Sequence, residues 1–288
     1  MHAKLKIVTA MIIYGSIGTF IRNIDLFPGE IAFLRAAIGS MFLIGVSFFF
    51  KQQSSYKFIK KNILLLILSG TALGINWIFL FQAYEYTSIA NATLSYYFAP
   101  LHVIVLASFI LKEKLTPFRI GCVLAAMLGL SLIVMFDGDP LYYSYNHIPG
   151  IAYGLLASVF YASVILMNKF IKSLSGFATT LVQLMCAALV LLPYAALKDG
   201  LGFLSVSPTS IFLVLTVGII HTGIAYLLFF SAIKDLKGQT IAVMSYIDPI
   251  SAVIIAAIFL GESMSFIQIT GGIFILGSTF LSEKFAPN

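Results

Sequence analysis

The chain divides into ten apolar blocks, each about as long as a helix that crosses a lipid bilayer. The blocks cover residues 5–21, 30–50, 62–83, 89–111, 117–136, 149–168, 176–197, 208–232, 239–260 and 265–282. About 20 apolar helical residues span the roughly 30 Å of hydrocarbon in a membrane. In lipid every backbone N–H and C=O group needs an internal partner, which leaves the helix as the natural structure for such blocks. The sequence therefore predicts an all-α membrane protein with ten transmembrane helices.

Composition excludes several other classes of protein. The chain is 60% hydrophobic and 10% charged, against roughly 45–50% and about 25% in soluble domains. The net charge of +6 comes from basic residues dispersed between the blocks, and the aromatic residues lie within them, which argues against nucleic-acid binding. Cys122 and Cys186 fall within spans, and neither GxxxxGK[ST] nor HExxH occurs. We expect no catalytic residue, no metal and no cofactor.

The basic residues also predict how the chain is oriented. If the N-terminus is cytoplasmic, the outer connections hold only Arg22 and Lys198, and Arg35 lies within a span. All other basic residues then lie on the inner side, which is the bias found in cytoplasmic loops. This alternation predicts ten spans with both termini in the cytoplasm. No convincing signal-peptide cleavage site follows the first apolar block, so we interpret that block as the first membrane helix.

The two halves of the chain resemble each other. Residues 90–115 align without a gap with residues 239–264 at an offset of 149, which matches Tyr97 with Tyr246 and Pro100 with Pro249. Five spans in each half is an odd number, so the second half enters the membrane from the opposite side. We therefore predict two inverted five-helix repeats, 1–140 and 141–288. Interrupted helices at matching positions of such repeats mark the binding site of many transporters.

The paired prolines predict a break in the fourth and ninth spans. A proline has no N–H, so Pro100 and Pro249 would leave the carbonyl groups of Tyr96 and Ser245 without helical donors. At membrane depth a freed carbonyl must face protein, water or a substrate. We interpret both prolines as hinges of helices that line a central cavity. A packing kink without a mechanistic role is the alternative.

Asp248 is the most informative single residue, because an aspartate within a span costs about 2.5–3.5 kcal/mol on insertion scales. Helical spacing would place Ser245, Asp248 and Ser251 on one stripe. Asp248 could bind a substrate amine or carry the coupled proton. A structural ion pair or hydrogen bond is the alternative.

Arg35 and His221 are two further polar groups within spans. The planar guanidinium of Arg35 could bind a carboxylate or phosphate. Arg35 could equally pair with Glu30 or Asp248, or extend to the membrane interface. His221 could relay protons, or it could be a neutral histidine that hydrogen-bonds to a neighbouring helix.

A set of aromatic and amide side chains predicts the walls of a substrate pocket with a few polar contacts. Taken singly, each member is better explained by packing than by ligand binding. Together with Arg35 and Asp248, the predicted substrate-binding set comprises Asn76, Trp77, Tyr97, Tyr161, Gln183, Tyr226 and Tyr246.

These features resemble the EamA-type permeases of the drug/metabolite transporter superfamily. The resemblance rests on the ten spans, the five-plus-five repeat, the prolines of the fourth and ninth spans, and the turns that carry Glu113 and Glu262. The stretch Phe33-Leu34-Arg35 resembles the arginine often found in the second span of that family. The resemblance implies a multi-pass secondary-active transporter of the bacterial inner membrane that exports amino acids or related small polar metabolites.

Other functions stay open at this point. An aromatic pocket around one carboxylate would also suit a proton-coupled exporter of drugs or other cations. An importer of a nucleoside-like or cofactor-like metabolite, a passive channel and an intramembrane enzyme are further alternatives, although no nucleophile with its base is evident for the last. The expected partners are a small-molecule substrate and the lipid bilayer, without nucleic acid. Substrate, direction, coupling ion and oligomeric state are open, with a monomer as one possibility.

Overall fold

The computed structural model describes residues 2–21, 23–49, 56–87, 92, 95–112, 116–135, 147–198, 206–259 and 266–285, and the regular structure in these ranges is helical. In the first half the helices are α1 (Ala3–Ile21), α2 (Pro28–Phe49), α3 (Tyr56–Tyr86), α5 (Ala99–Ile110) and α6 (Pro117–Met135). In the second half they are α7 (His147–Phe170), α8 (Gly176–Lys198), α9 (Pro208–Thr216), the π-helix η2 (Val217–Ile224), α10 (Ala225–Ile233), α11 (Gly238–Met244), α12 (Ile247–Phe259) and α13 (Phe266–Lys284). The predicted turn residues Glu113 and Glu262 lie outside the described ranges.

The helices confirm the all-α membrane fold with ten spans. Within the described ranges, six helical segments are long and apolar enough to cross a membrane by length and composition. One of them, Pro208–Ile233, runs through α9, η2 and α10 without interruption. The remaining spans consist of the shorter helices α5, α6 and α13 and of the interrupted pair α11 and α12.

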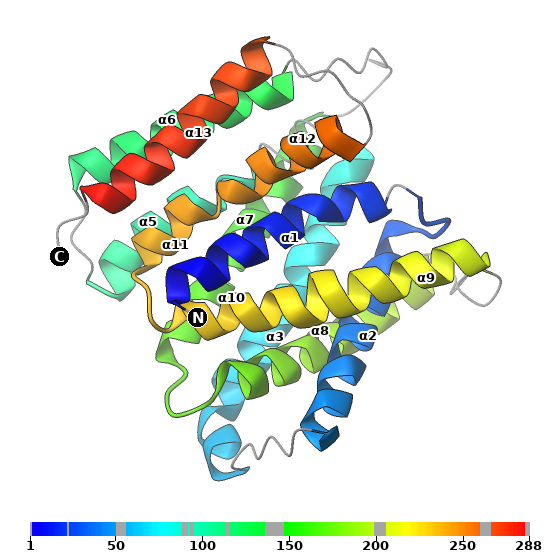
Figure 1. Ribbon diagram of the computed structural model, residues 1–288. Helices are drawn as coiled ribbons and strands as arrows, with labels where there is room; N and C mark the ends of the chain where they lie inside the picture. The colour runs from blue at the N-terminus through cyan, green and yellow to red at the C-terminus, as the bar shows by residue number, and fades with distance from the viewer. Residues whose placement is uncertain are drawn as a thin grey trace.

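The packing of the helices follows the repeat. Helix α2 packs against its counterpart α8, and α6 packs against its counterpart α13 (Figure 1). Helix α3 packs against α7, and in the same relation α10 packs against α1. Helices α5 and α7 repeat the contact between α12 and α1. Each of these contacts between helices recurs with the roles of the two halves swapped, as expected for two inverted five-helix repeats. The predicted boundary between residues 140 and 141 lies outside the described ranges.

The fourth and ninth spans are interrupted within one residue of matching positions, as the prolines predict. Each break is a single tight turn, closed by hydrogen bonds of 3.3 Å from Phe98 N to Ser95 O and from Tyr246 N to Val243 O. Pro100 and Pro249 then lie in the first turns of α5 and α12, where a backbone N–H has no helical partner in any case. The prolines therefore start the second half of each broken helix.

Two details of the predicted ninth span are wrong. The carbonyl of Ser245 is not left free, because it accepts the N–H of Asp248 at 3.3 Å. The predicted stripe of Ser245, Asp248 and Ser251 also fails, since the helix ends between Ser245 and Asp248. The Ser245 hydroxyl donates to Ile241 O at 2.8 Å, and Asp248 lies in the first turn of α12.

Close packing of α1 on α12 fixes the position of this first turn. A Cβ atom at Gly15 would lie 2.7 Å from the carbonyl oxygen of Asp248 and 2.7 Å from the Cβ of Ser251. Only a residue without a side chain permits such an approach of two helices. Gly15 therefore determines how near Asp248 stands to α1.

We expect the substitution Gly15→Val to lower the stability of the purified protein, because overpacking of this kind costs about 1–3 kcal/mol. The measurement is the apparent melting temperature in detergent. Gly18→Val is the matched control, since a Cβ at Gly18 meets nothing within 4 Å. Equal melting temperatures for the two variants would contradict the close contact between α1 and α12.

Candidate functional site

Aromatic rings from three helices meet in the interior of the bundle. Tyr14 of α1 lies edge-on to Tyr226 of α10, with ring centroids 5.2 Å apart. Trp77 of α3 lies edge-on to the same Tyr226 at 5.8 Å. Trp77 and Tyr226 are matched positions of the two repeats, so here the pseudo-symmetry brings repeat partners into contact. Both rings are at least 95% buried, and they form part of the core.

A second group of rings continues this wall. Tyr161 of α7 stacks on Phe229 of α10, with centroids 6.1 Å apart. Tyr96 lies 5.8 Å from Tyr161, and Tyr14 lies 6.2 Å from Phe229. The two groups therefore join into one aromatic cluster, which we define as Tyr14, Trp77, Tyr96, Tyr161, Tyr226 and Phe229.

Arg35 of α2 lies at one end of the aromatic cluster. Its Nε donates a hydrogen bond of 3.0 Å to Oγ1 of Thr222 in η2. Its Cζ lies 4.3 Å from the centre of the Trp77 ring, in the geometry of a cation–π contact. The residue is 9% exposed, which does not favour the alternative in which it extends to the membrane interface. Among the described residues, the bond to Thr222 is the hydrogen bond that orients the guanidinium.

Asp248 lies at the other end of the cluster, in the first turn of α12, where its side chain interacts with that of Tyr97. The ring of Tyr97 lies 5.8 Å from that of Tyr96, a member of the cluster, measured between ring centroids. A series of ring contacts therefore connects Arg35 of the first half, at Trp77, with Asp248 of the second half, at Tyr97.

Tyr97 and Tyr246 lie where the two broken helices meet. Their rings stack with centroids 6.4 Å apart at 27°, and the Tyr246 hydroxyl donates to the carbonyl of Tyr97 at 3.2 Å. Tyr246 is fully buried. Its hydroxyl is thus engaged with backbone, which favours a framework role, whereas Tyr97 faces Asp248.

The two predicted amides differ in their surroundings. Asn76 of α3 donates to the carbonyl of Ala157 in α7 at 2.6 Å, and its Oδ1 has no partner among the described residues. Gln183 of α8 donates to the Ser69 hydroxyl of α3. A Cβ at Gly70 would lie 2.8 Å from the Gln183 carbonyl, so Gln183 belongs to the tight α3–α8 contact. Its described contacts do not join it to the aromatic cluster.

His221 lies in η2, one residue before Thr222. Its Nε2 is 2.9 Å from the Ser16 hydroxyl of α1, and its ring is 4.8 Å from that of Phe20. It is 2% exposed, and within the described ranges its Nδ1 has no partner. The side chain thus connects η2 to α1, which is the hydrogen-bonded alternative considered for it.

Sequence reasoning missed four residues of this region, which are Tyr14, Tyr96, Phe229 and Thr222. Tyr14 matches Tyr161 at an offset of 147, and that correspondence could have added it to the set. Tyr96 precedes a chosen tyrosine and carries no signal of its own. Thr222 lies in an apolar stretch, and a π-helix has the same composition as an α-helix. The sequence therefore gave no indication of its hydrogen bond to Arg35.

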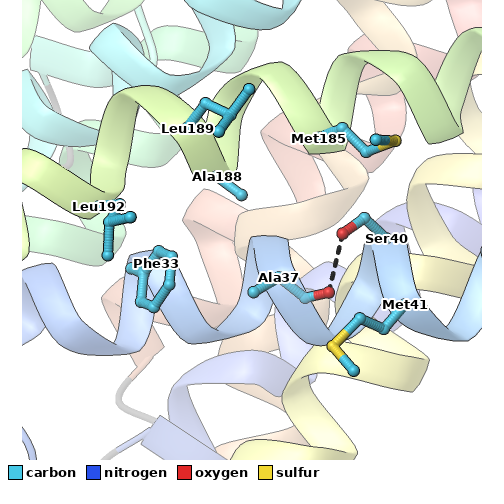
Figure 2. A pocket seen from close by; sticks show the side chains of 8 residues that line it. All are labelled: Phe33, Ala37, Ser40, Met41, Met185, Ala188, Leu189 and Leu192. Atoms are coloured by element: carbon cyan, nitrogen blue, oxygen red, sulfur yellow. Dashed lines mark hydrogen bonds between the residues drawn. The ribbon is translucent and has the colours of Figure 1, made fainter.

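A groove of about 200 Å³ opens between α2 and α8 on the outside of the bundle (Figure 2). Its lining is Phe33, Ala37, Ser40, Met41, Met185, Ala188, Leu189 and Leu192. The one hydroxyl among them, that of Ser40, donates to the Ala37 carbonyl at 2.8 Å. Met41 and Leu189 are 69% and 70% exposed. This apolar surface offers no charge to a polar cargo, in contrast to the region between Arg35 and Asp248.

The interior side chains have the polar and aromatic chemistry that a small zwitterion requires. A guanidinium edge suits a carboxylate, a carboxylate suits an ammonium group, and aromatic walls suit the intervening carbon atoms. Among the described residues, no three His, Cys, Asp or Glu side chains gather as metal ligands.

Comparison with known proteins places this arrangement in context. The sequence profile of the EamA-like transporter family matches residues 3–135 and again residues 148–283. An uncharacterized transporter of Bacillus subtilis (strain 168), named YxxF, is 32% identical over 282 residues, which cover 97% of this chain and 89% of that protein. The threonine/homoserine exporter RhtA of Escherichia coli (strain K12) is 30% identical over 264 residues, covering 89% of this chain and 83% of the exporter.

A solved structure shows the same fold. One crystal structure superimposes with a TM-score of 0.87 over 99% of this chain and 98% of the other, at 16% sequence identity.

The protein RarD of Salmonella typhi is 23% identical over 292 residues, covering 97% of this chain and 96% of RarD. The profile and these relatives cover both halves of the chain.

Proposed function

Because the chain belongs to the EamA-like transporter family, a family of multi-pass membrane transporters, we propose that it exports an amino acid or a related small zwitterion by secondary-active transport. The observation that carries this proposal is the series of ring contacts that connects Arg35, at Trp77, with Asp248, at Tyr97. Arg35 binds the substrate carboxylate and Asp248 binds the ammonium group. Trp77, Tyr161 and Tyr226 form the walls, and Tyr97 lies beside Asp248. Asn76 offers its Oδ1, which has no partner among the described residues.

The fold suggests how the site is exposed. Arg35 comes from the first repeat and Asp248 from the second, so a substrate held by both connects the two halves. Rocking of one repeat against the other exposes a midplane site first to one side and then to the other. The breaks before Pro100 and Pro249 are the hinges in this proposal. Their stacked tyrosines, Tyr97 and Tyr246, remain in contact as the frame about which the halves turn.

The substrate class has one additional support. RhtA, whose name describes export of threonine and homoserine, resembles this chain over most of both sequences. Both amino acids carry an α-carboxylate and an α-ammonium group, the two groups that Arg35 and Asp248 would bind. We place the protein in the bacterial inner membrane with both termini cytoplasmic. The orientation is supported by the excess of basic residues in the connections assigned to the inner side. Residues 1–140 and 141–288 are the two repeats in this proposal.

The test is flux of labelled threonine and homoserine through proteoliposomes that contain the purified protein. We expect saturable flux, and acceleration of labelled efflux by unlabelled amino acid on the opposite side. Liposomes without protein are the control. Flux that neither saturates nor shows counterflow would indicate a channel, and absence of any amino-acid flux would contradict the proposal.

The aromatic cluster beside a carboxylate favours a second candidate, a proton-coupled exporter of lipophilic cations. In that case Asp248 exchanges a proton for the cation, and Arg35 repels the cargo rather than binding it. Efflux of cationic dyes from cells that express the protein, beside efflux of amino acids, separates the two. Dye efflux that improves when Arg35 is neutralised would favour the second candidate.

A further inference from the structure

In the contact between Arg35 and the π-helix, the Thr222 hydroxyl acts both as a hydrogen-bond donor and as an acceptor. The Thr222 hydroxyl donates its proton to the carbonyl of Val217, five residues earlier, at 3.1 Å. Its oxygen therefore has lone pairs left to accept the hydrogen bond from Arg35 Nε at 3.0 Å. One hydroxyl thus binds the π-turn on one side and the guanidinium on the other. Both Thr222 and Arg35 are buried, at 0% and 9% exposed.

Packing holds the Thr222 side chain in this orientation. A Cβ atom at Gly39 of α2 would lie 3.1 Å from the Cγ2 methyl of Thr222 and 3.1 Å from the carbonyl of Gly218. A Cβ at Gly218 would in turn lie 2.5 Å from Ile38. The π-helix and α2 therefore approach each other closely at Gly39 and Gly218, and the Thr222 methyl group packs where Gly39 has no side chain. Single π-turns inside α-helices are found frequently at functional sites.

The guanidinium of Arg35 is thereby held on two of its surfaces. Its Nε edge is bound by Thr222, and its flat face lies on Trp77, with Cζ 4.3 Å from the ring centre. In the described part of the chain the Nη groups donate no hydrogen bond. They form the paired donor edge that suits a carboxylate.

We propose that Thr222 is a positioning residue that holds Arg35 against Trp77 so that its Nη edge is presented to the carboxylate of the substrate. The inference rests on the proposed function for the identity of the ligand. The link between Thr222, Arg35 and Trp77 does not depend on it. Without the Thr222 oxygen, the long arginine side chain samples several rotamers, and binding of a carboxylate must then also order it.

The chain contains one tryptophan, Trp77, so intrinsic tryptophan fluorescence reports on this contact directly. We test Thr222→Val, which keeps the shape and removes the oxygen, and Thr222→Ser, which keeps the oxygen. Thr216→Val is the matched control, because among the described residues the Thr216 hydroxyl bonds to the carbonyl of Phe212 in its own helix, at 2.9 Å. Arg35→Gln, alone and combined with Thr222→Val, shows whether Thr222 acts through Arg35.

We expect the ligand-free emission of Thr222→Val to differ from that of the wild type, whereas Thr222→Ser and Thr216→Val match it. In titrations with threonine, Thr222→Val should raise the apparent Kd about tenfold, the effect of about one hydrogen bond to a charged group. Threonine amide, which lacks the carboxylate, should bind equally to both proteins. In the Arg35→Gln background, Thr222→Val should have no further effect.

The outcomes separate the two proposals. If wild-type protein neither transports nor binds amino acids, the proposed function fails, and the ligand-free spectra still decide the link between Thr222 and Arg35. If amino acids bind but Thr222→Val has wild-type emission and an unchanged Kd, the positioning role is wrong. A Kd raised equally for threonine and its amide would also overturn it, because that pattern reflects general disturbance of the site.

Discussion

The substitution Asp248→Asn is expected to reduce amino-acid flux in proteoliposomes by roughly 30-fold or more. Asparagine keeps the size of the side chain and its contact with Tyr97, but it removes the negative charge that faces the substrate ammonium. Loss of one partner of a desolvated charge pair costs about 2–5 kcal/mol or more, which corresponds to this factor or a larger one. The measurement is the initial rate of labelled threonine flux against substrate concentration.

Two control variants make this result specific. Asp25→Asn makes the same change in the exposed connection before α2, and it should leave flux unchanged. Asp248→Glu retains the charge and should retain part of the activity. If Asp248 carries the coupled proton instead of the ammonium group, Asp248→Asn abolishes the pH dependence of flux but leaves counterflow intact. Normal flux with normal pH dependence would contradict both roles.

The substitution Arg35→Lys is expected to raise the KM for threonine roughly 10–100-fold, although the charge is kept. Lysine has a compact ammonium group without the planar fork, so it cannot bind Thr222 with one edge and a carboxylate with the other. Hydrogen bonds to charged groups contribute about 1.5–3 kcal/mol. The measurement is competition for flux between threonine and threonine amide.

The selectivity between these two ligands identifies the cause. In the wild type the free amino acid should compete far better than its amide, and in Arg35→Lys the difference should largely disappear. Lys198→Gln is the control for a changed surface charge, because Lys198 pairs with Glu85 at 2.6 Å in a partly exposed salt bridge. Such pairs contribute little. A wild-type preference retained by Arg35→Lys would show that the carboxylate binds elsewhere.

The sequence predicted the architecture because a lipid bilayer permits few backbone structures. Hydrophobic length determined the spans, and the matched prolines predicted the breaks in the fourth and ninth spans. The inverted repeat followed from an odd number of spans in each half. These features depend on composition and on the period of the repeat, both of which are visible in one sequence.

The internal contacts of the site were less accessible to prediction. Asp248 was expected on a continuous polar stripe of one helix. The helix is interrupted at Ser245 and Tyr246, and Asp248 lies in the first turn of α12. Gln183 was grouped with the pocket as an amide side chain within a span, yet it packs against Ser69 and Gly70. Thr222 could not be found, because a π-helix changes which residues face α2 without changing their polarity.

The most direct measurement of the central claim is a titration of Trp77 fluorescence with three ligands of one size. They are threonine, threonine amide, and the hydroxy acid in which the α-amine of threonine is replaced by a hydroxyl. If one zwitterion bridges Arg35 and Asp248, threonine binds much more tightly than either analogue. Arg35→Gln then removes the preference over the amide, and Asp248→Asn removes the preference over the hydroxy acid. Equal affinities for all three ligands would contradict a site built from these two charges.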